Sequence, residues 1–443
     1  MARVPSGSSP SLDILPAGAD APALRCPSNR GNSSPLAIAR YGQNGDLDSK
    51  FGSGGLAEGY PLAGIGISIA VQPDGRILAT GVAVLNPSSA RGTCIVLIRR
   101  NPSGVPDSRF GRGPPGRVHT CMWVHQTLRA GLEGQSVLVG GDRKIIVGGV
   151  ARYGNSRSTG IVVRYKPDGR NDPSFSGDRR TRSWRKGAIE IGAPGQRESS
   201  ISEVKLAGRG KILVSGQYGG RFLLARLNRN GSLDRSFGRK GITTTDVDGA
   251  KKCACSFGRG MAIDRHRRIL AVGYYPNHIA LVRYHRDGRL DRSFGRKGIV
   301  RTKLGQRARA FRVAVQHDGR IVVAAESDGR FTVVRYRAGG HLDQSFFGDG
   351  VYATKFFGGQ DSVAYDLLID GKGRIVASGG GPNLGQFVLL RFLQGPAPRV
   401  GQEPTHTGVP RAGFINLAKF VTEIFSIGLA ITEIPGKIVD AVR

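Results

Sequence analysis

The segment Leu290-Asp291-Arg292-Ser293-Phe294-Gly295 decides the fold, because closely related segments recur along the chain. Successive copies are separated by 59, 65, 62, 57 and 52 residues when the aspartates are compared. Repetition at such intervals is typical of proteins built from one supersecondary unit used many times. The aspartates of the six copies are Asp48, Asp107, Asp172, Asp234, Asp291 and Asp343.

Two other segments recur in each period. Residues 313–325 (VAVQHDGRIVVAA) show an Asp-Gly turn between two apolar runs, which is a strong signal for a β-hairpin. Residues 331–339 (FTVVRYRAG) form a third apolar run that ends in Arg-Tyr and a second turn. With the segment after Phe-Gly, such as residues 298–303, counted as its first strand, each period contains four short strands.

Four antiparallel strands per unit predict an all-β fold, a β-propeller, because radial packing of neighbouring units buries both faces of each sheet. The 67 Gly and 23 Pro residues favour many tight turns over a helical bundle. A solenoid of strands is the alternative. Six units run from Phe51 to Phe392, and residues 36–41 add one more copy of the Arg-aromatic strand. We therefore expect six blades with a spare strand, whereas seven blades would require missing strands.

These motifs, LDxSFGxxG, DGR and F-x-V-x-RY-x-x-DG, resemble the delta-60 repeat family of bacterial proteins over about residues 36–395. The resemblance implies propeller-like repeats in large, often exported proteins, with no established catalytic activity. It suggests an extracellular or cell-envelope location, although no signal peptide is visible. The copies at Asp142-Arg143-Lys144 and Gly208-Arg209-Gly210 depart from the DGR turn, and Ser176 replaces a glycine.

Composition divides the chain into four parts. Residues 1–35 form a Ser/Pro-rich tail that we expect to be disordered, 36–395 the propeller, 396–410 a linker and 411–443 a C-terminal helix. Residues 414–434 are apolar with a narrow polar stripe, which predicts an amphipathic helix. This helix could dock on the propeller, join a partner helix or contact the membrane interface, and the sequence favours docking or self-association.

Charged residues recur at two positions of the repeat. They could line a central channel, or they could form an Arg–Asp pair that locks each blade. A catalytic site is normally made once, so we favour the structural role, with a buried Arg–carboxylate pair. We interpret the recurring phenylalanine as a plug between blades. Besides the six aspartates, the recurring residues are Arg40, Arg99, Arg164, Arg226, Arg283, Arg335 and Arg391.

Basic residues that break the repeat are the better candidates for ligand binding. The chain carries 65 Lys and Arg against 33 Asp and Glu, a net charge of +32, which attracts polyanions. One basic cluster surrounds an aromatic side chain that could stack on a base or a sugar. Solvated loops and an Arg-rich composition are the alternatives. The candidate residues are Arg179, Arg180, Arg182, Trp184, Arg185, Lys186, Arg265, Arg267 and Arg268.

Signatures of enzymes are scarce in this sequence. It has no GxSxG, P-loop, HExxH or dinucleotide motif, and its five cysteines are too few and irregular for a disulfide framework or a zinc site. We interpret the cysteines as strand and loop residues, and we expect no metal and no cofactor. The sequence favours a non-catalytic binding or scaffold module for an anionic ligand, such as nucleic acid or acidic polysaccharide, or for a protein. The alternatives are a hydrolase or lyase with one site at the channel mouth, and an envelope or secreted surface protein.

Overall fold

The fold was analysed in a computed structural model. It describes residues 11–12, 37–41, 48–58, 64–84, 93–124, 127–153, 157–178, 183–191, 198–249, 256–381, 387–392, 431–432 and 439–440. These residues form only strands, turns and loops, and none of them belongs to a helix that could cross a membrane. The all-β class predicted from the sequence is confirmed.

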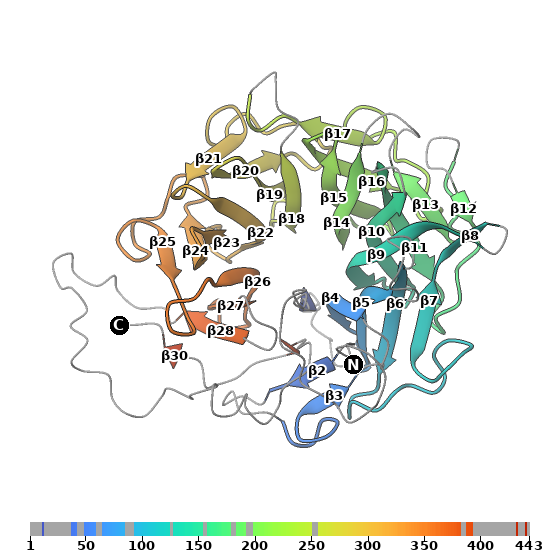
Figure 1. Cartoon of the computed structure of the whole chain (residues 1–443). Helices are drawn as coiled ribbons and strands as arrows, with labels where there is room; N and C mark the ends of the chain where they lie inside the picture. The colour runs from blue at the N-terminus through green and yellow to red at the C-terminus, as the bar shows by residue number, and fades with distance from the viewer. Residues whose placement is uncertain are drawn as a thin grey trace, which may run out of the picture.

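Antiparallel sheets are arranged radially around a common centre (Figure 1). In the regular sheets the four strands follow the chain order from the inside outward, so that each sheet is a simple meander. The third sheet contains β14 (Ser199–Leu206), β15 (Ile212–Tyr218), β16 (Arg221–Leu227) and β17 (Ile242–Thr245). The fourth sheet contains β18 (Phe257–Ile263), β19 (Ile269–Tyr275), β20 (His278–Tyr284) and β21 (Ile299–Lys303). The fifth sheet contains β22 (Ala308–Val315), β23 (Ile321–Ser327), β24 (Arg330–Tyr336) and β25 (Val351–Thr354).

The remaining sheets carry additions to this plan. The first sheet contains β4 (Gly64–Val71), β5 (Ile77–Val84), β6 (Thr93–Arg100) and β7 (Arg117–Thr120), with β1 (Ser11–Leu12) beside β4. The second contains β9 (Thr127–Val139), β10 (Ile145–Tyr153), β11 (Arg157–Tyr165) and β13 (Ala188–Ile191), with β8 (Met122–Val124) and β12 (Ser183–Arg185) at its edges. The sixth contains β26 (Val363–Ile369), β27 (Ile375–Gly380) and β28 (Phe387–Phe392), with β30 (Val439–Asp440) beside β28. A further sheet contains β2 (Ala37–Arg40), β3 (Leu56–Glu58) and β29 (Ile431–Thr432).

The short pair β2 and β3 lies between β28 and the sheet of β4 in the ring (Figure 1). β2 is the extra Arg-aromatic strand noted in the sequence, and β3 pairs with it as an outer strand. The C-terminal helix predicted for residues 414–434 falls outside the described residues, except that Ile431–Thr432 is the strand β29 beside β2.

The repeat unit of the sequence is out of frame with the blade. We expected the strand after the Phe-Gly pair to begin a new unit, but this expectation is wrong. β21 pairs with β20, so it is the outermost strand of the blade that the preceding residues build. The reason is that residues 285–298, which contain the segment Leu290 to Gly295, join β20 to β21 as antiparallel neighbours.

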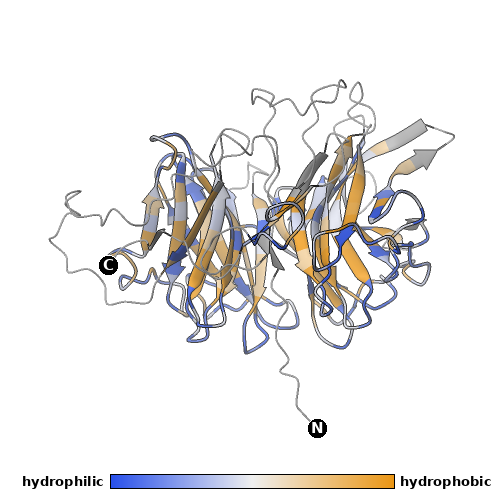
Figure 2. Ribbon diagram, turned by 90° about the horizontal axis from the view of Figure 1, so that it is seen from below, coloured by the Kyte–Doolittle hydropathy of each residue, from blue (hydrophilic) through white to orange (hydrophobic). Residues whose placement is uncertain are grey.

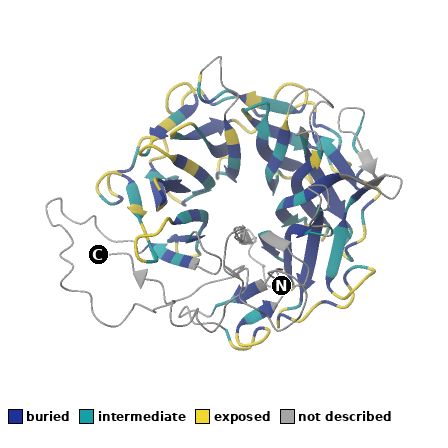
Figure 3. Ribbon diagram, in the orientation of Figure 1, coloured by how far each residue is buried: buried dark blue, intermediate teal, exposed yellow. Residues whose placement is uncertain are grey.

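The hydrophobic core lies between the blades. Interior strands such as β23 are buried along their whole length, whereas exposed residues lie mainly in the turns (Figure 3). One cluster joins Leu270 and Leu281 of one blade to Ala310, Val323 and other apolar residues of the next. Because both faces of a blade are covered, the apolar runs are nearly continuous rather than strictly alternating.

A phenylalanine and a glycine form the contact between one blade and the next. Phe237 is fully buried and packs against the turn after β20, where Gly288 has φ +84°. A Cβ atom at Gly288 would lie 2.6 Å from Phe237 Cζ, so that only glycine fits. Phe110, Phe175 and Phe294 meet Gly169, Gly231 and Gly340 in the same way.

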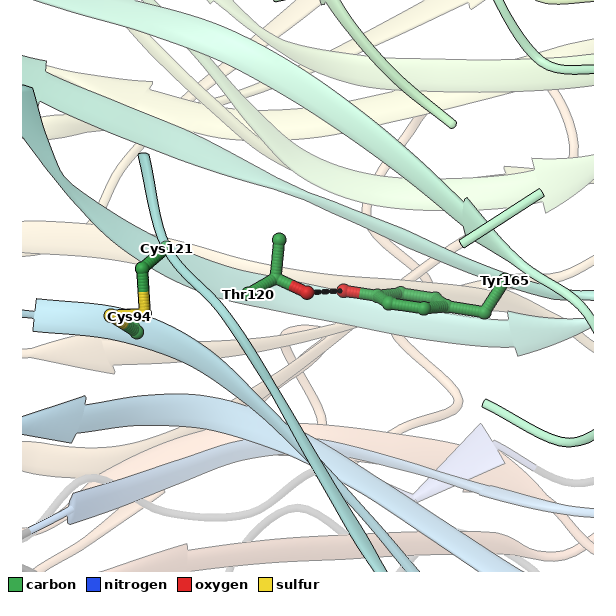
Figure 4. The surroundings of a disulfide bond; sticks show 4 residues. All are labelled: Cys94, Thr120, Cys121 and Tyr165. Atoms are coloured by element: carbon green, nitrogen blue, oxygen red, sulfur yellow. Dashed lines mark hydrogen bonds between the residues drawn. A yellow bond between two sulfur atoms is a disulfide. The ribbon is translucent and has the colours of Figure 1, made fainter. Parts of the chain in front are cut away.

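Tyrosine–threonine hydrogen bonds connect neighbouring blades further out. Thr120 of β7 and Tyr165 of β11 lie 2.7 Å apart through their oxygens (Figure 4). Tyr284 donates to Thr245 at 2.7 Å, and Thr302 and Tyr336 make the third such bond at 2.8 Å. All three tyrosines are the aromatic residues of the Arg-Tyr motif.

A disulfide bond joins Cys94 to Cys121 beside the first of these contacts (Figure 4). From the sequence we expected both cysteines to be ordinary strand and loop residues, and the bond between them was not predicted. In the structure, Ile95 of β6 pairs with Thr120 of β7, so Cys94 and Cys121 are the next two residues of that register. The pairing depends on this register, which the sequence spacing did not reveal.

Replacing Gly288 with alanine tests the contact between blades. The Gly288→Ala variant should lose about 3 kcal/mol in free energy of unfolding, because both a left-handed backbone and a steric overlap become unfavourable. Gly319 has nearly the same φ, +87°, but its Cβ would meet Ala338 Cβ at an ordinary 3.5 Å. Gly319→Ala should therefore cost only about 1 kcal/mol. Urea unfolding measures both, and equal losses would contradict the proposed overlap.

Candidate functional site

The recurring arginine binds three groups at once. Arg283 Nε donates to Asp291 Oδ2 at 2.7 Å, and its Nη1 donates to the carbonyl oxygen of Ala338 in the next blade at 2.7 Å. Its Nη2 lies 3.4 Å from Ser293 Oγ, and the guanidinium carbon lies 4.4 Å from the centre of the Phe294 ring. One side chain thus connects its own strand, the following turn and the neighbouring blade.

This arrangement is repeated around the ring. Apart from Arg40, which is on β2, the arginines lie on the third strand from the centre, so these pairs are set back from the central channel. The Nε of Arg391 differs, since it is buried and no hydrogen bond to it is found in the described part of the chain. The pairs are Arg40–Asp48, Arg99–Asp107, Arg164–Asp172, Arg226–Asp234, Arg283–Asp291 and Arg335–Asp343.

Four of these carboxylates are held in the charged form. Burial alone opposes ionisation of Asp172, but hydrogen bonds from Lys144 and Ser174, together with Arg164, lower its pKa to about 2. Hydrogen bonds and arginine charges outweigh burial in the same way at Asp234, Asp291 and Asp343, and the pKa of each is lowered. In each pair the arginine and the aspartate bind each other, so neither charge is available to a ligand.

These lowered pKa values predict sensitivity to acid. Stability from a carboxylate with a lowered pKa is complete above the unfolded value of about 3.9 and is lost as pH falls towards the folded value. The free energy of unfolding should therefore drop between about pH 4 and pH 2, by about 1–2 kcal/mol for Asp172. In Asp172→Asn this part of the pH dependence should vanish. Urea titrations across this range, with the exposed Asp142→Asn as control, measure it; an unchanged profile would contradict the assignment.

A second charged cluster lies on the inner strands and occurs once. It contains Glu203 and Lys205 of β14, Arg312 of β22 and Asp366 of β26. Lys205 Nζ lies 2.8 Å from Glu203 Oε1, Arg312 Nη1 lies 3.7 Å from Glu203 Oε2, and Arg312 Nε donates to Asp366 Oδ1 at 3.2 Å. The strand between, β18, has Gly260 where a side chain would stand, which lets Arg312 approach.

The inner-strand cluster replaces simpler contacts found in the first blades. Ser68 Oγ accepts the N–H of Val137 at 3.1 Å, and Ser136 Oγ accepts that of Val204 at 3.3 Å. Each serine directly follows a β-bulge of its strand, as does Glu203, which accepts the N–H of Met261. The glutamate therefore keeps the hydrogen bond to the next blade and adds a charge.

Burial dominates the electrostatics of this cluster. Burial raises the pKa of Glu203 and of Asp366. It also opposes the charge on Lys205, but the Glu203 carboxylate outweighs this effect and raises the pKa of the lysine. Each carboxylate is engaged by a cation and a backbone N–H, which is the pattern of a structural ion-pair network rather than of a free general base.

Exchanging the Arg312–Asp366 pair for apolar residues tests this view. Asp366→Leu alone should lose about 3–5 kcal/mol, because it leaves Arg312 buried without its partner. The double variant Arg312→Met/Asp366→Leu should be more stable than that single variant, since it removes the unpaired charge as well. Denaturant unfolding gives both values. A double variant that is no more stable than Asp366→Leu would contradict the network.

We define the turn face as the end of the blades that carries the turns after the first and third strands. In the edge-on view of Figure 2, hydrophilic turns line the lower edge of the ring. The turn between β18 and β19 exposes Arg265, His266 and Arg267, and Arg268 is half-buried and paired with Asp264 at 2.7 Å. Arg292, Arg296 and Lys297 are exposed in the turn between β20 and β21.

Several cations of the turn face occupy left-handed backbone positions. Arg267 has φ +61° at the place where the corresponding turns have Gly75 and Gly319. A residue with a Cβ pays an energetic penalty there that glycine avoids. Five of the nine non-glycine residues with positive φ in the described chain are basic, namely Arg143, Arg209, Lys240, Arg267 and Lys297.

A cleft of about 310 Å³ opens beside Arg265. It lies between the turn that joins β18 to β19 and the turn that joins β22 to β23, with Ala338 at one side. Its polar lining includes Asp264, Arg265, His266, Arg268, Gln316 and His317. No group of three or more His, Cys, Asp and Glu residues suited to a metal ion occurs among the residues that the structure describes.

The predicted basic residues fall in two separate places. Arg179, Arg180 and Arg182 lie outside the described residues, and Trp184 and Arg185 are on β12, where only the backbone is described. Lys186 is exposed in the turn after β12, at the outer edge of the second sheet. Arg265, Arg267 and Arg268 lie next to the innermost strand of the fourth sheet, so the structure does not bring the two groups together. The cleft and the inner-strand cluster were missed, because their residues lie about 50 or more positions apart.

Comparison with protein families supports the repeat architecture. Residues 72–110, 140–175, 210–237, 267–294 and 316–346 each match the model of a family described as a β-propeller domain of unknown function (DUF5122). The chain is thus a repeat protein of the β-propeller class. No curated protein is significantly similar to it in sequence.

Solved structures with a similar arrangement are distant. A protein from Lactobacillus plantarum has a TM-score of 0.44 at 12% identity, covering 82% of this chain and 93% of that one. A protein of unknown function from Dyadobacter fermentans has a TM-score of 0.42 at 10% identity, with coverage of 80% and 96%. Virginiamycin B lyase from Staphylococcus aureus has a TM-score of 0.34 at 10% identity, with coverage of 61% and 72%. Similarities this low carry no functional argument.

Proposed function

We propose that this protein is a non-catalytic binding module that holds an anionic ligand on its turn face. The observation that carries the proposal is the set of five basic residues in left-handed positions, all in turns of that face. Glycine would be more stable at each position, by about 1 kcal/mol. Strain of this kind is typically retained where a side chain is used.

The distribution of charge supports the same proposal. Each aspartate of the repeat is neutralised by its own arginine, and Asp264 by Arg268, so these acids do not offset the exposed cations. The net charge of +32 then raises the local concentration of anions near the surface. Nucleic acid and acidic polysaccharide are the two natural classes of polyanion for such a surface.

For the scaffold, we propose a ring with six main blades. In this proposal β2 and β3 are the additional unit that the sequence count leaves over, and they occupy the position between the last main blade and the first. Their place beside β28 in Figure 1 supports it. The same ring displays the turns of all blades on one face, which suits a binding module.

Changing the strained arginines to glycine tests the binding proposal. Arg143→Gly/Arg267→Gly should unfold at a higher temperature, because glycine accepts the left-handed backbone. The same variant should bind heparin and a DNA duplex less tightly, with a shallower dependence of log Kd on log salt, by about 2 for duplex DNA if both arginines contact phosphates. Fluorescence titration at several salt concentrations and thermal unfolding measure the two effects.

The control removes the same charge from the other end of the blades. Lys303 and Arg330 are exposed there, and Lys303→Gln/Arg330→Gln should leave the salt dependence nearly unchanged. Equal weakening by both double variants would show that only net charge matters. Absence of binding by the unaltered protein at physiological salt would overturn the proposal.

A further inference from the structure

The cleft between the fourth and fifth sheets has features that a bare basic surface lacks. Its walls are two turns from different blades, one of which has His266-Arg267 where the other has Asp318-Gly319. Its volume of about 310 Å³ lies at the lower end of the range for small-molecule sites, about 300–1,000 Å³. The space therefore suits a compact ligand rather than a long polymer.

The acidic groups in the cleft are already committed. Asp264 Oδ1 accepts the N–H groups of His266 at 2.9 Å and Arg268 at 2.8 Å, and its Oδ2 accepts Arg268 Nε at 2.7 Å. Asp318 is paired with Arg320 and accepts its N–H at 2.9 Å. These bonds leave Arg265 and two imidazoles as the groups that can meet an incoming anion.

The arginine and the histidines come from both walls. Arg265 Nε donates to His266 Nε2 at 3.1 Å, so these two side chains are adjacent on one wall. His317 stands on the facing turn, and its side chain makes no hydrogen bond to the described residues. A guanidinium and imidazoles arranged on two sides suit a tetrahedral oxyanion, whose several oxygens can be bound at once.

The buried amide of Gln316 belongs to the scaffold rather than to the ligand site. Gln316 is only 7% exposed, and its Nε2 donates to the carbonyl oxygen of Gly373, in the turn between β26 and β27, at 3.0 Å. Its Oε1 is buried, as is Oε1 of Gln72 at the corresponding position of the turn between β4 and β5. This oxygen is therefore a feature of the repeat that a ligand in the cleft does not reach.

The lining of the cleft also contains apolar carbon. Ile263 and Val315 end the two inner strands there, and Ala338 borders the same space. An inorganic ion would leave these groups unused, whereas the carbon skeleton of a sugar could pack on them. The lining thus combines cations and an apolar surface within one small volume.

We propose that this cleft binds a phosphate monoester of a small organic compound, such as a sugar phosphate. The phosphate meets Arg265, His266 and His317, and the carbon skeleton packs on Ile263, Val315 and Ala338. The inference rests on the proposed function of the turn face, which it deepens by naming the ligand class. The phosphate belongs either to a free metabolite or to the phosphorylated end of a polymer.

Calorimetry on the full chain with ribose 5-phosphate, ribose and inorganic phosphate tests the proposal. Ribose 5-phosphate should bind at least about tenfold more tightly than inorganic phosphate, and ribose should not bind detectably. Arg265→Gln/His317→Asn should weaken ribose 5-phosphate by at least about tenfold. The control Arg235→Gln/Arg239→Gln, at exposed cations of the turn face outside the cleft, should change it less than about twofold.

Further arms separate the two sources of phosphate and the two proposals. Tighter binding of an oligonucleotide with a 5′-phosphate than of ribose 5-phosphate indicates the end of a polymer, and the reverse order indicates a metabolite. If heparin binds but ribose 5-phosphate does not, the cleft proposal fails and the proposed function stands. If neither binds, both fail. Unaltered affinity in Arg265→Gln/His317→Asn would also overturn the cleft proposal, and thermal unfolding verifies that the variant is folded.

Discussion

The contact between each arginine, its aspartate and the following blade is the constraint on which the ring depends. A four-stranded sheet cannot bury both of its faces alone, so every blade needs a neighbour in a fixed position. The arginine fixes this position by donating to Asp291 within its blade and to Ala338 in the next, as Arg283 does. Phe294 underneath excludes water from the pair, which strengthens the hydrogen bonds.

Two further layers of contact accompany this one. Towards the rim, a tyrosine next to the arginine reaches the outer strand of the preceding blade, as Tyr284 reaches Thr245. Towards the centre, three residues that follow a bulge bind the next inner strand, namely Ser68, Ser136 and Glu203. The repeat therefore fixes the blades by short contacts, and the inner-strand cluster adds one longer connection across β18 through Arg312.

The parts of the structure that could be predicted are those encoded within one period. Asp-Gly turns, β-branched runs and the repeated aspartates indicated hairpins and blades, because each depends on residues a few positions apart. The expectation that β21 begins the following blade was wrong, since a period in sequence does not reveal which strands pair. The cleft and the inner-strand cluster were not predictable, because they join blades: Arg312 and Asp366 are separated by 54 residues. The Cys94–Cys121 bond needed the register of β6 and β7.

The residues that repeat in every blade hold the scaffold together, whereas the residues that occur once in exposed turns are the candidates for ligand binding. The repeated residues are saturated by each other, so a ligand gains little by approaching them. In the exposed turns, Arg143 and Arg267 occupy positions where the corresponding turns have glycine, and both adopt a left-handed backbone. Because the Arg–Asp–Phe contacts hold the scaffold, the backbone strain at these two arginines does not disrupt the fold. A ring of equivalent turns can in this way carry one distinct site without a separate domain.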